Sequence, residues 1–265
     1  DGETGLELGR LKQAFGRWQT GVAGFGWNAL FVENHDVPRI VSKWGDSERY
    51  WQQSATAIAS LYFLMQGTPF IYQGQEIGMT NTRFEGIDDF DCVGSRNQYA
   101  QLKQQGMDEG HIIQTLARGS RDNARTPMQW DAGPGAGFTR GTPWFKVNPN
   151  TETINVAAQQ GDPDSVLGFY RRLIRLRKAE PALIYGRYRL ELESDSQVYA
   201  YSRLLDGQHW LVLVNLSDRP AEQRQLPWPL RHERLALANY PVEPHPAGDT
   251  LDLRPFEARV YRLND

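Results

Sequence analysis

The sequence predicts a parallel α/β domain followed by a smaller, antiparallel β domain of the sandwich type. Two observations predict the first domain: short apolar runs alternate with segments of helical periodicity, and a polar cluster follows each apolar run. A third observation predicts the second domain, because short apolar segments separated by turns replace the helical pattern after Pro181. We expect the boundary near residues 179–186, with domains at 1–180 and 181–265.

The first part of the α/β domain has the order helix, strand, helix, strand. Residues 6–18 carry apolar side chains at helical spacing, and residues 27–32 form an apolar, aromatic run typical of a buried parallel strand. Residues 54–65 predict a second helix, residues 67–69 a turn, and residues 70–72 a second buried strand. The polar clusters are therefore expected together, because the carboxyl ends of parallel strands meet at one edge of a sheet.

A long irregular stretch follows, from residue 79 to about residue 150. It predicts one helix, near residues 108–116, and its aromatic side chains favour order over disorder. Residues 164–179 predict an amphipathic helix with Ser165 as a capping residue near its start. In the β domain the expected strands are 188–192, 198–203, 209–216, 233–238 and 258–263.

Composition excludes several classes of protein. The chain has 265 residues and a formal net charge of −3, without a long basic run, which argues against binding to nucleic acid or to a membrane surface. No apolar stretch approaches the roughly 20 residues of a membrane span. The single cysteine, Cys92, cannot form an internal disulfide, so we expect a cytoplasmic location.

Two polar segments follow the predicted strands. Residues 31–39 place His35 and Asp36 at the mouth of the first strand, where they form a structural ion pair, a strand-end turn or part of a functional site. Residues 67–79 contain Glu76, which is either a pocket wall or a buried hydrogen-bonding carboxylate; we favour the latter.

A third polar segment, residues 120–131, places two arginines and two aspartates around a proline turn. One interpretation is an internal salt-bridge lock. The other is an arginine that reaches into a pocket, where it binds sugar hydroxyls or orients a carboxylate.

Together the three segments resemble the α-amylase superfamily, glycoside hydrolase family 13. More narrowly, they resemble the group of oligo-1,6-glucosidases, α-glucosidases, dextran glucosidases and trehalose-6-phosphate hydrolases. Asn34-His35-Asp36 with Pro38-Arg39 matches the family's fourth conserved region, and residues 67–79 match its eighth-strand segment. Residues 121–131 match a signature of the exo-acting glucosidases, residues 253–258 resemble their C-terminal strand, and the likeness covers essentially the whole chain.

The resemblance implies a fold and a site. The fold would be the C-terminal portion of a (β/α)8 TIM barrel, about strands seven and eight with a long insertion after the eighth, followed by the antiparallel β domain. Asp36 would be the catalytic carboxylate that stabilises the transition state, and His35 would hydrogen-bond the same sugar. Arg125 would hold the non-reducing-end glucose through an aspartate outside this chain, whereas we interpret Arg121 as structural. Val37 stands where many relatives carry a polar residue, so contacts beyond the cleaved bond are open.

The resemblance also implies what this chain lacks. The nucleophile and the acid/base of a retaining α-glucosidase stand on the fourth and fifth barrel strands, and no segment here matches them. We therefore expect a C-terminal fragment that is inactive alone and needs the N-terminal half of the barrel as a partner. The substrates of the complete enzyme would be α-linked gluco-oligosaccharides. We expect no cofactor and no metal, because the family's calcium site would lie in the absent half. The alternatives are a non-catalytic relative that serves as a binding or partner subunit, and a bare carbohydrate-binding module formed by residues 186–265.

Overall fold

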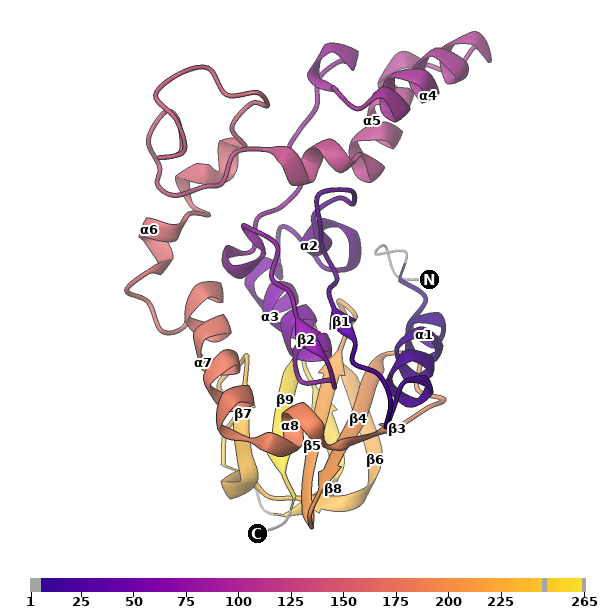
Figure 1. Ribbon diagram of the computed structural model, residues 1–265, viewed down its shortest axis with the longest axis vertical. Helices are drawn as coiled ribbons and strands as arrows, with labels where there is room; N and C mark the ends of the chain where they lie inside the picture. Colours follow the sequence, from indigo (N-terminus) through magenta and orange to yellow (C-terminus); the bar gives the residue numbers. More distant parts are fainter. Residues whose placement is uncertain (1–5, 245–246, 264–265) are drawn as a thin grey trace. The chain divides into compact units, whose positions relative to one another are not determined.

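The computed structural model describes residues 6–244 and 247–263, and the chain divides into two compact units (Figure 1). Each unit contains a buried apolar cluster of its own. Of the described residues, the first unit takes 6–31, 44–70, 169–244 and 247–263, and the second takes 32–43 and 71–168.

The described elements are as follows. The α-helices are α1 (Leu8–Gly21), α2 (Ile40–Trp44), α3 (Trp51–Phe63), α4 (Val93–Gln104), α5 (Glu109–Gly119), α6 (Val156–Gln159), α7 (Val166–Ala179) and α8 (Pro181–Tyr185). The 3₁₀ helices are η1 (Gln75–Ile77), η2 (Ile87–Asp89), η3 (Arg121–Arg125), η4 (Pro149–Glu152) and η5 (His232–Arg234). The strands are β1 (Ala29–Leu30), β2 (Thr68–Pro69), β3 (Arg187–Glu191), β4 (Val198–Leu205), β5 (Gln208–Asn215), β6 (Ala221–Leu230), β7 (Leu235–Ala238), β8 (Gly248–Leu253) and β9 (Ala258–Arg262).

In the first unit, β1 and β2 form a two-stranded parallel sheet in which Ala29 lies opposite Thr68. Both strands are shorter than predicted, and β2 precedes the expected residues 70–72. The prediction of buried strands is wrong for their aromatic side chains, because Phe31 is 51% exposed and Phe70 is 55% exposed. The reason is that this sheet has only two strands among the described residues, so its outer edges and faces lack the cover that a larger parallel sheet provides.

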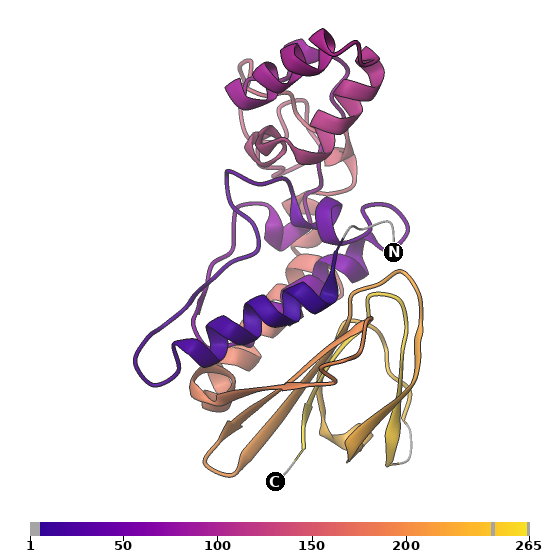
Figure 2. The same cartoon turned by 90° about the vertical axis from the view of Figure 1, so that its right-hand side faces the viewer.

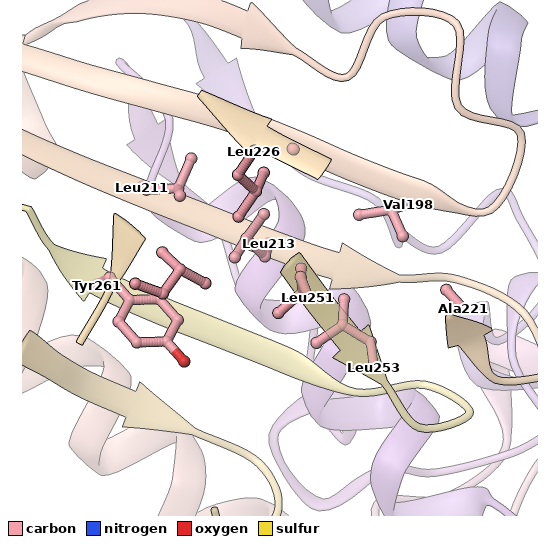
Figure 3. Close-up of a cluster of buried hydrophobic side chains, with 10 residues drawn as sticks. Val198, Leu211, Leu213, Ala221, Leu226, Leu251, Leu253 and Tyr261 are labelled. Carbon is pink, nitrogen blue, oxygen red and sulfur yellow. The ribbon is translucent and has the colours of Figure 1, made fainter. Parts of the chain in front are cut away.

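The β domain consists of two antiparallel sheets, one with the strand order β3-β4-β5-β9-β7 and one formed by β6 and β8 (Figure 1). Figure 2 shows the two sheets as separate layers. Side chains from both sheets meet in the buried cluster of Figure 3, in which Leu211 and Leu213 of β5 lie near Leu226 of β6 and Leu251 of β8. This arrangement stabilises the domain by removing apolar surface from water.

The five strands expected from sequence are present, but β6 and β8 were missed. Strand β6 contains Pro227 and Pro229 and has register shifts in its pairing with β8, so it shows no clean alternation of apolar and polar residues. Strand β8 begins with Gly248 and Asp249, which are typical of turns.

Three buried tyrosines lie close together in the five-stranded sheet, and one of them bonds a helix of the first unit. The hydroxyl groups of Tyr188 and Tyr199 lie 2.9 Å apart, and the Tyr201 hydroxyl donates to the carbonyl of Leu61 in α3 at 3.0 Å. Burial raises the pKa of Tyr188 to about 12 and raises the pKa of Tyr199 and Tyr201 further. The tyrosines therefore remain neutral hydrogen-bonding groups in the folded protein.

The second unit is built largely from the segment after β2. Helices α4 and α5 lie next to each other in both views (Figures 1 and 2) and pack around a buried cluster that includes Phe90 and Ile112. Helix α5 confirms the predicted helix near residues 108–116, whereas α4 was not predicted. Ser95 is the buried residue of α4, so this helix carries almost no apolar periodicity.

Helix α7 confirms the predicted helix at residues 164–179, and the Ser165 hydroxyl accepts the backbone N–H of Gly168 at 3.0 Å, as expected of a cap. Within residues 6–244 and 247–263, none of the helices combines the length and the apolar character needed to cross a bilayer.

Candidate active site

The turn after β1 presents His35 and Asp36 to solvent. The side-chain oxygen of Asn34 accepts the backbone N–H of Asp36 at 2.8 Å, which closes a tight polar turn. The His35 and Asp36 side chains are 69% and 51% exposed, and His35 Nε2 lies 3.2 Å from Asp36 Oδ2. Both residues can therefore meet a ligand.

The two residues of a buried ion pair flank this turn in the sequence, one on each side. Glu33 and Arg39 are fully buried, and Arg39 Nη1 lies 2.7 Å from Glu33 Oε1. The second Glu33 oxygen accepts the backbone N–H of Ile40 at 3.0 Å. Burial raises the pKa of Glu33, and the Arg39 charge opposes that rise. The pair fixes both ends of the turn that carries His35 and Asp36.

Arg39 also holds the segment after β2. Its Nη1 donates to the Gln73 carbonyl at 2.8 Å, and its Nη2 donates to the Ala124 carbonyl at 3.5 Å. Gly74 has a φ of +90°, and a Cβ there would collide with the Met79 sulfur. One guanidinium thus binds the three polar segments singled out in the sequence.

Glu76 is half-buried and accepts the Gly74 backbone N–H at 2.8 Å. Burial raises the pKa of this carboxyl. The bond agrees with the favoured interpretation of Glu76 as a hydrogen-bonding carboxylate rather than a pocket wall, but the side chain is half-buried rather than buried.

The third polar segment forms the 3₁₀ turn η3. The Ser120 hydroxyl caps the turn by accepting the Asp122 backbone N–H at 3.2 Å. Asp122 is fully buried, and its Oδ2 accepts the backbone N–H groups of Asp91 and Cys92 at 3.0 and 2.9 Å. The Tyr72 hydroxyl donates to the Ala124 carbonyl at 2.9 Å. The turn is thereby bound both to the segment after β2 and to the start of α4.

Both arginines of η3 contact Asp36. Arg121 Nη1 and Arg125 Nη2 donate to the same oxygen, Asp36 Oδ1, at 3.0 and 3.2 Å. Arg125 Nε also donates to the His35 carbonyl at 3.2 Å, and its Nη1 lies 3.7 Å from Asp122 Oδ1. The hydrogen bond from Arg121 lowers the pKa of Asp36, and the charges of His35, Arg121 and Arg125 lower it further. Asp36 is therefore an exposed, ionised carboxylate in a cationic frame.

The structure brings together all three residues predicted for the site, Asp36, His35 and Arg125. It adds Arg121, which the sequence interpretation took as structural, and Asp122 behind Arg125. The signal for Arg121 was its place in the same short turn as Arg125, but nothing in the sequence shows which partner it meets.

Chemically, this cluster can bind hydroxyl groups, and it lacks a matched pair of reacting carboxylates. Three carboxylates near the site are engaged elsewhere: Glu33 is paired with Arg39, Asp122 is fully buried, and Glu76 bonds the Gly74 backbone. Asp36 differs from these three because its side chain is half exposed and can meet a ligand. A retaining glycosidase needs two carboxyl groups about 5 Å apart.

The sequence profile described as "Alpha amylase, catalytic domain" matches residues 4–186. The chain belongs to the α-amylase family. A second profile, described as a domain of unknown function (DUF3459), matches residues 186–258 of this α-amylase-family chain.

Curated relatives are similar over nearly all of the chain. Probable oligo-1,6-glucosidase 3 of Bacillus subtilis is 43% identical over 256 residues, which cover 97% of this chain and 46% of the relative. Trehalose-6-phosphate hydrolase of Escherichia coli is 44% identical over 253 residues, which cover 94% of this chain and 45% of the relative. The α-amylase-family chain thus spans about half the length of the curated relatives it matches.

Solved structures give the same result. Trehalose-6-phosphate hydrolase of Bacillus licheniformis superposes with a TM-score of 0.91 at 40% identity, covering 97% of this chain and 47% of the other. Trehalulose synthase of Pseudomonas mesoacidophila superposes with a TM-score of 0.90 at 38% identity, covering 98% and 47%. The fold is the C-terminal portion of a (β/α)8 barrel followed by an antiparallel β domain, as predicted.

Proposed function

We propose that this chain is the C-terminal part of a retaining α-glucosidase that hydrolyses α-linked gluco-oligosaccharides from the non-reducing end. The observation that carries the proposal is the exposed, ionised Asp36 held by Arg121 and Arg125 beside His35, in a chain of the α-amylase family. The names of its relatives, oligo-1,6-glucosidase and trehalose-6-phosphate hydrolase, support the substrate class.

In this proposal Asp36 accepts sugar hydroxyls and stabilises the positive charge that develops at the sugar in the transition state. His35 donates to the same sugar, because its ring is exposed beside Asp36. Arg125 binds the terminal glucose, and Asp122 and the His35 carbonyl hold its guanidinium in place.

The nucleophile and the acid/base belong to the N-terminal half of the barrel, which we propose as the partner of this chain. An apolar cavity of about 600 Å³ in the first unit supports this, and Trp18, Trp27, Leu30 and Tyr62 contribute to its lining. Trp18 is 64% exposed and Trp27 is 48% exposed, although both are apolar aromatic groups. Such a surface is typical of one that another element covers.

The same proposal includes a place in carbohydrate metabolism and a cytoplasmic location; the single, buried cysteine supports the location, because disulfides are typical of oxidising compartments. We place the domain boundary between residues 180 and 181. Pro181, which favours the first turn of a helix, begins α8 there, directly before the antiparallel strands.

The test is a chimera in which this chain replaces the corresponding C-terminal part of an oligo-1,6-glucosidase. We expect the chimera to release nitrophenol from p-nitrophenyl α-glucoside, and we expect the isolated chain to show no turnover. Asp36→Asn should lower kcat by at least about 100-fold, the scale for losing one transition-state electrostatic contact, whereas Asp218→Asn, an exposed carboxylate of the β domain, should have no effect.

Two results would contradict the proposal. A folded chimera without turnover would show that this chain does not serve an α-glucosidase site, and would favour a non-catalytic partner subunit. Turnover by the isolated chain that survives Asp36→Asn would place the reacting carboxylates elsewhere.

A further inference from the structure

Arg121 joins two groups that lie far apart in the sequence. Its Nη1 donates to Asp36 Oδ1 at 3.0 Å, and its Nε donates to the Cys92 sulfur at 3.1 Å. The two bonds use different nitrogen atoms of one planar guanidinium, so the position of the sulfur helps to fix the direction in which Nη1 points. The Arg121 side chain is 40% exposed, and without the sulfur its outer end would have more freedom.

Cys92 is itself held firmly. It is buried directly before α4, and its backbone N–H donates to the buried carboxylate of Asp122 at 2.9 Å. Burial favours the neutral thiol, but hydrogen bonds from Ser95 and Arg121 outweigh burial and lower the pKa of the thiol. The sulfur is therefore a hydrogen-bond acceptor in a fixed place.

Arg125 differs from Arg121 in how its bonds are shared. Its guanidinium is divided among Asp36, Asp122 and the His35 carbonyl, and it is only 18% exposed. The Arg121 guanidinium bonds Asp36 and Cys92. Because both arginines donate to Oδ1, the lone pairs of Oδ2 remain for His35 and for a ligand.

We propose that Arg121 is a positioning residue for Asp36, and that the Cys92 sulfur holds Arg121 in the orientation this requires. Arg121 makes the carboxylate harder to protonate in acid and fixes which of its oxygens faces the sugar. The role in catalysis rests on the proposed function, but the effect on Asp36 does not, since it exists in the chain without substrate.

The first measurement is the pKa of Asp36 in the 265-residue chain, followed by carboxyl carbon NMR and assigned with Asp36→Asn. Arg121→Met should raise that pKa, because the carboxylate loses its strongest donor. Arg96→Met is the matched control: this arginine is 52% exposed on neighbouring α4 and faces Asp91, so the pKa of Asp36 should not move. An unchanged pKa in folded Arg121→Met would overturn the proposal.

Cys92 provides a second pair of variants that leave His35, Arg121 and Arg125 in place around Asp36. Cys92→Ser retains an acceptor and should keep the pKa of Asp36 close to that of the original chain. Cys92→Ala removes the acceptor and should raise the pKa, though less than Arg121→Met does. Equal values in the two Cys92 variants would show that the sulfur does not hold Arg121.

In the chimera, Arg121→Met should lower kcat/KM by about 10- to 100-fold, the scale of one lost charged hydrogen bond. The acid limb of its pH profile should also move to higher pH, because Asp36 takes up a proton more readily. Arg121→Lys should restore the charge but only part of the activity, since an ammonium cannot bond both partners with fixed geometry. An inactive parent chimera would contradict the proposed function alone, since the pKa measurements stand without it.

Discussion

At the scale of single residues, the Glu33–Arg39 pair connects the polar segments of the second unit. A buried ion pair is not by itself a source of stability, because both charges lose their hydration. Here the guanidinium also bonds the carbonyls of Gln73 and Ala124, so three separate segments receive from it the hydrogen bonds that water would otherwise supply. The pair therefore sets the relative position of the turns that bear Asp36 and Arg125.

Arg39→Met should lower the free energy of unfolding by about 3–5 kcal/mol at neutral pH, because Glu33 would remain buried without a partner. The pKa of Glu33 is already raised in the folded state, so stability falls as pH rises from the ordinary glutamate value of 4.5 through the raised value. Without Arg39 that pKa rises further, and the loss should be smaller at mildly acid pH, where Glu33 binds a proton.

Urea unfolding at two pH values measures this difference. Arg140→Met, an exposed arginine of the same unit, should change stability by no more than about 0.5 kcal/mol. A loss that does not depend on pH would show that the missing contacts to Gln73 and Ala124, rather than the uncompensated charge, dominate.

At the scale of elements, Arg177 of α7 caps the C-terminal end of α3. Its Nη1 donates to the carbonyls of Phe63 and Met65, both at 2.8 Å, and its Nη2 donates to the carbonyl of Gly67 at 2.6 Å. These carbonyls lie at and beyond the end of α3, where helices leave acceptors unpaired and favour cations. The same contacts fix the backbone that leads directly into β2.

Arg177→Met should destabilise the first unit by about 3 kcal/mol or more, because several buried carbonyls lose charged donors together. The matched control is Arg175→Met, an exposed residue two positions earlier on the same helix, which should be nearly neutral. Chemical unfolding followed by circular dichroism compares the two. Similar effects of both variants would show that α7 contributes through general charge rather than through these bonds.

How much the sequence predicted follows from the range of the interactions. Helices α5 and α7 were predictable because their own periodicity identifies them. The exposure of the aromatic side chains Trp27, Phe31 and Phe70 was not predictable, because it depends on how many strands the sheet has, and the described parallel sheet has two. Asp36, His35 and Arg125 were named from motifs, whereas the position of Arg121 on Asp36 spans 85 residues of sequence and required the structure.

At the scale of the whole molecule, the chain is interleaved between its two units. Strands β1 and β2 belong to the first unit, while the polar segments that follow them belong to the second. All residues of the candidate site therefore lie in one unit, and the exposed aromatic surface around α1 and β1 lies in the other. Phe25 is 83% exposed and Trp18 is 64% exposed on that surface.

Alone, the chain should bind a hydrophobic dye and self-associate, because exposed aromatic side chains grouped on one surface are typical of a site that another element covers. Phe25→Ser with Trp18→Ser should reduce dye fluorescence and shift the sedimentation profile towards the monomer. Trp144→Ser removes an equally exposed aromatic side chain from the other unit and serves as the control. Dye binding that responds only to Trp144→Ser would place the adhesive surface in the second unit instead.

The buried tyrosine cluster gives the chain an optical property of its own. Folding raises the pKa of Tyr188, Tyr199 and Tyr201 above the ordinary value of 10.0, so these tyrosines keep their protons near that pH. Their phenolate absorbance should therefore be missing from an alkaline titration of the native protein. Above that pH the unfolded chain releases protons that the folded chain retains, and stability falls. The missing absorbance should then appear abruptly when the sheet unfolds, so these tyrosines serve as an intrinsic spectroscopic probe of the folded β domain.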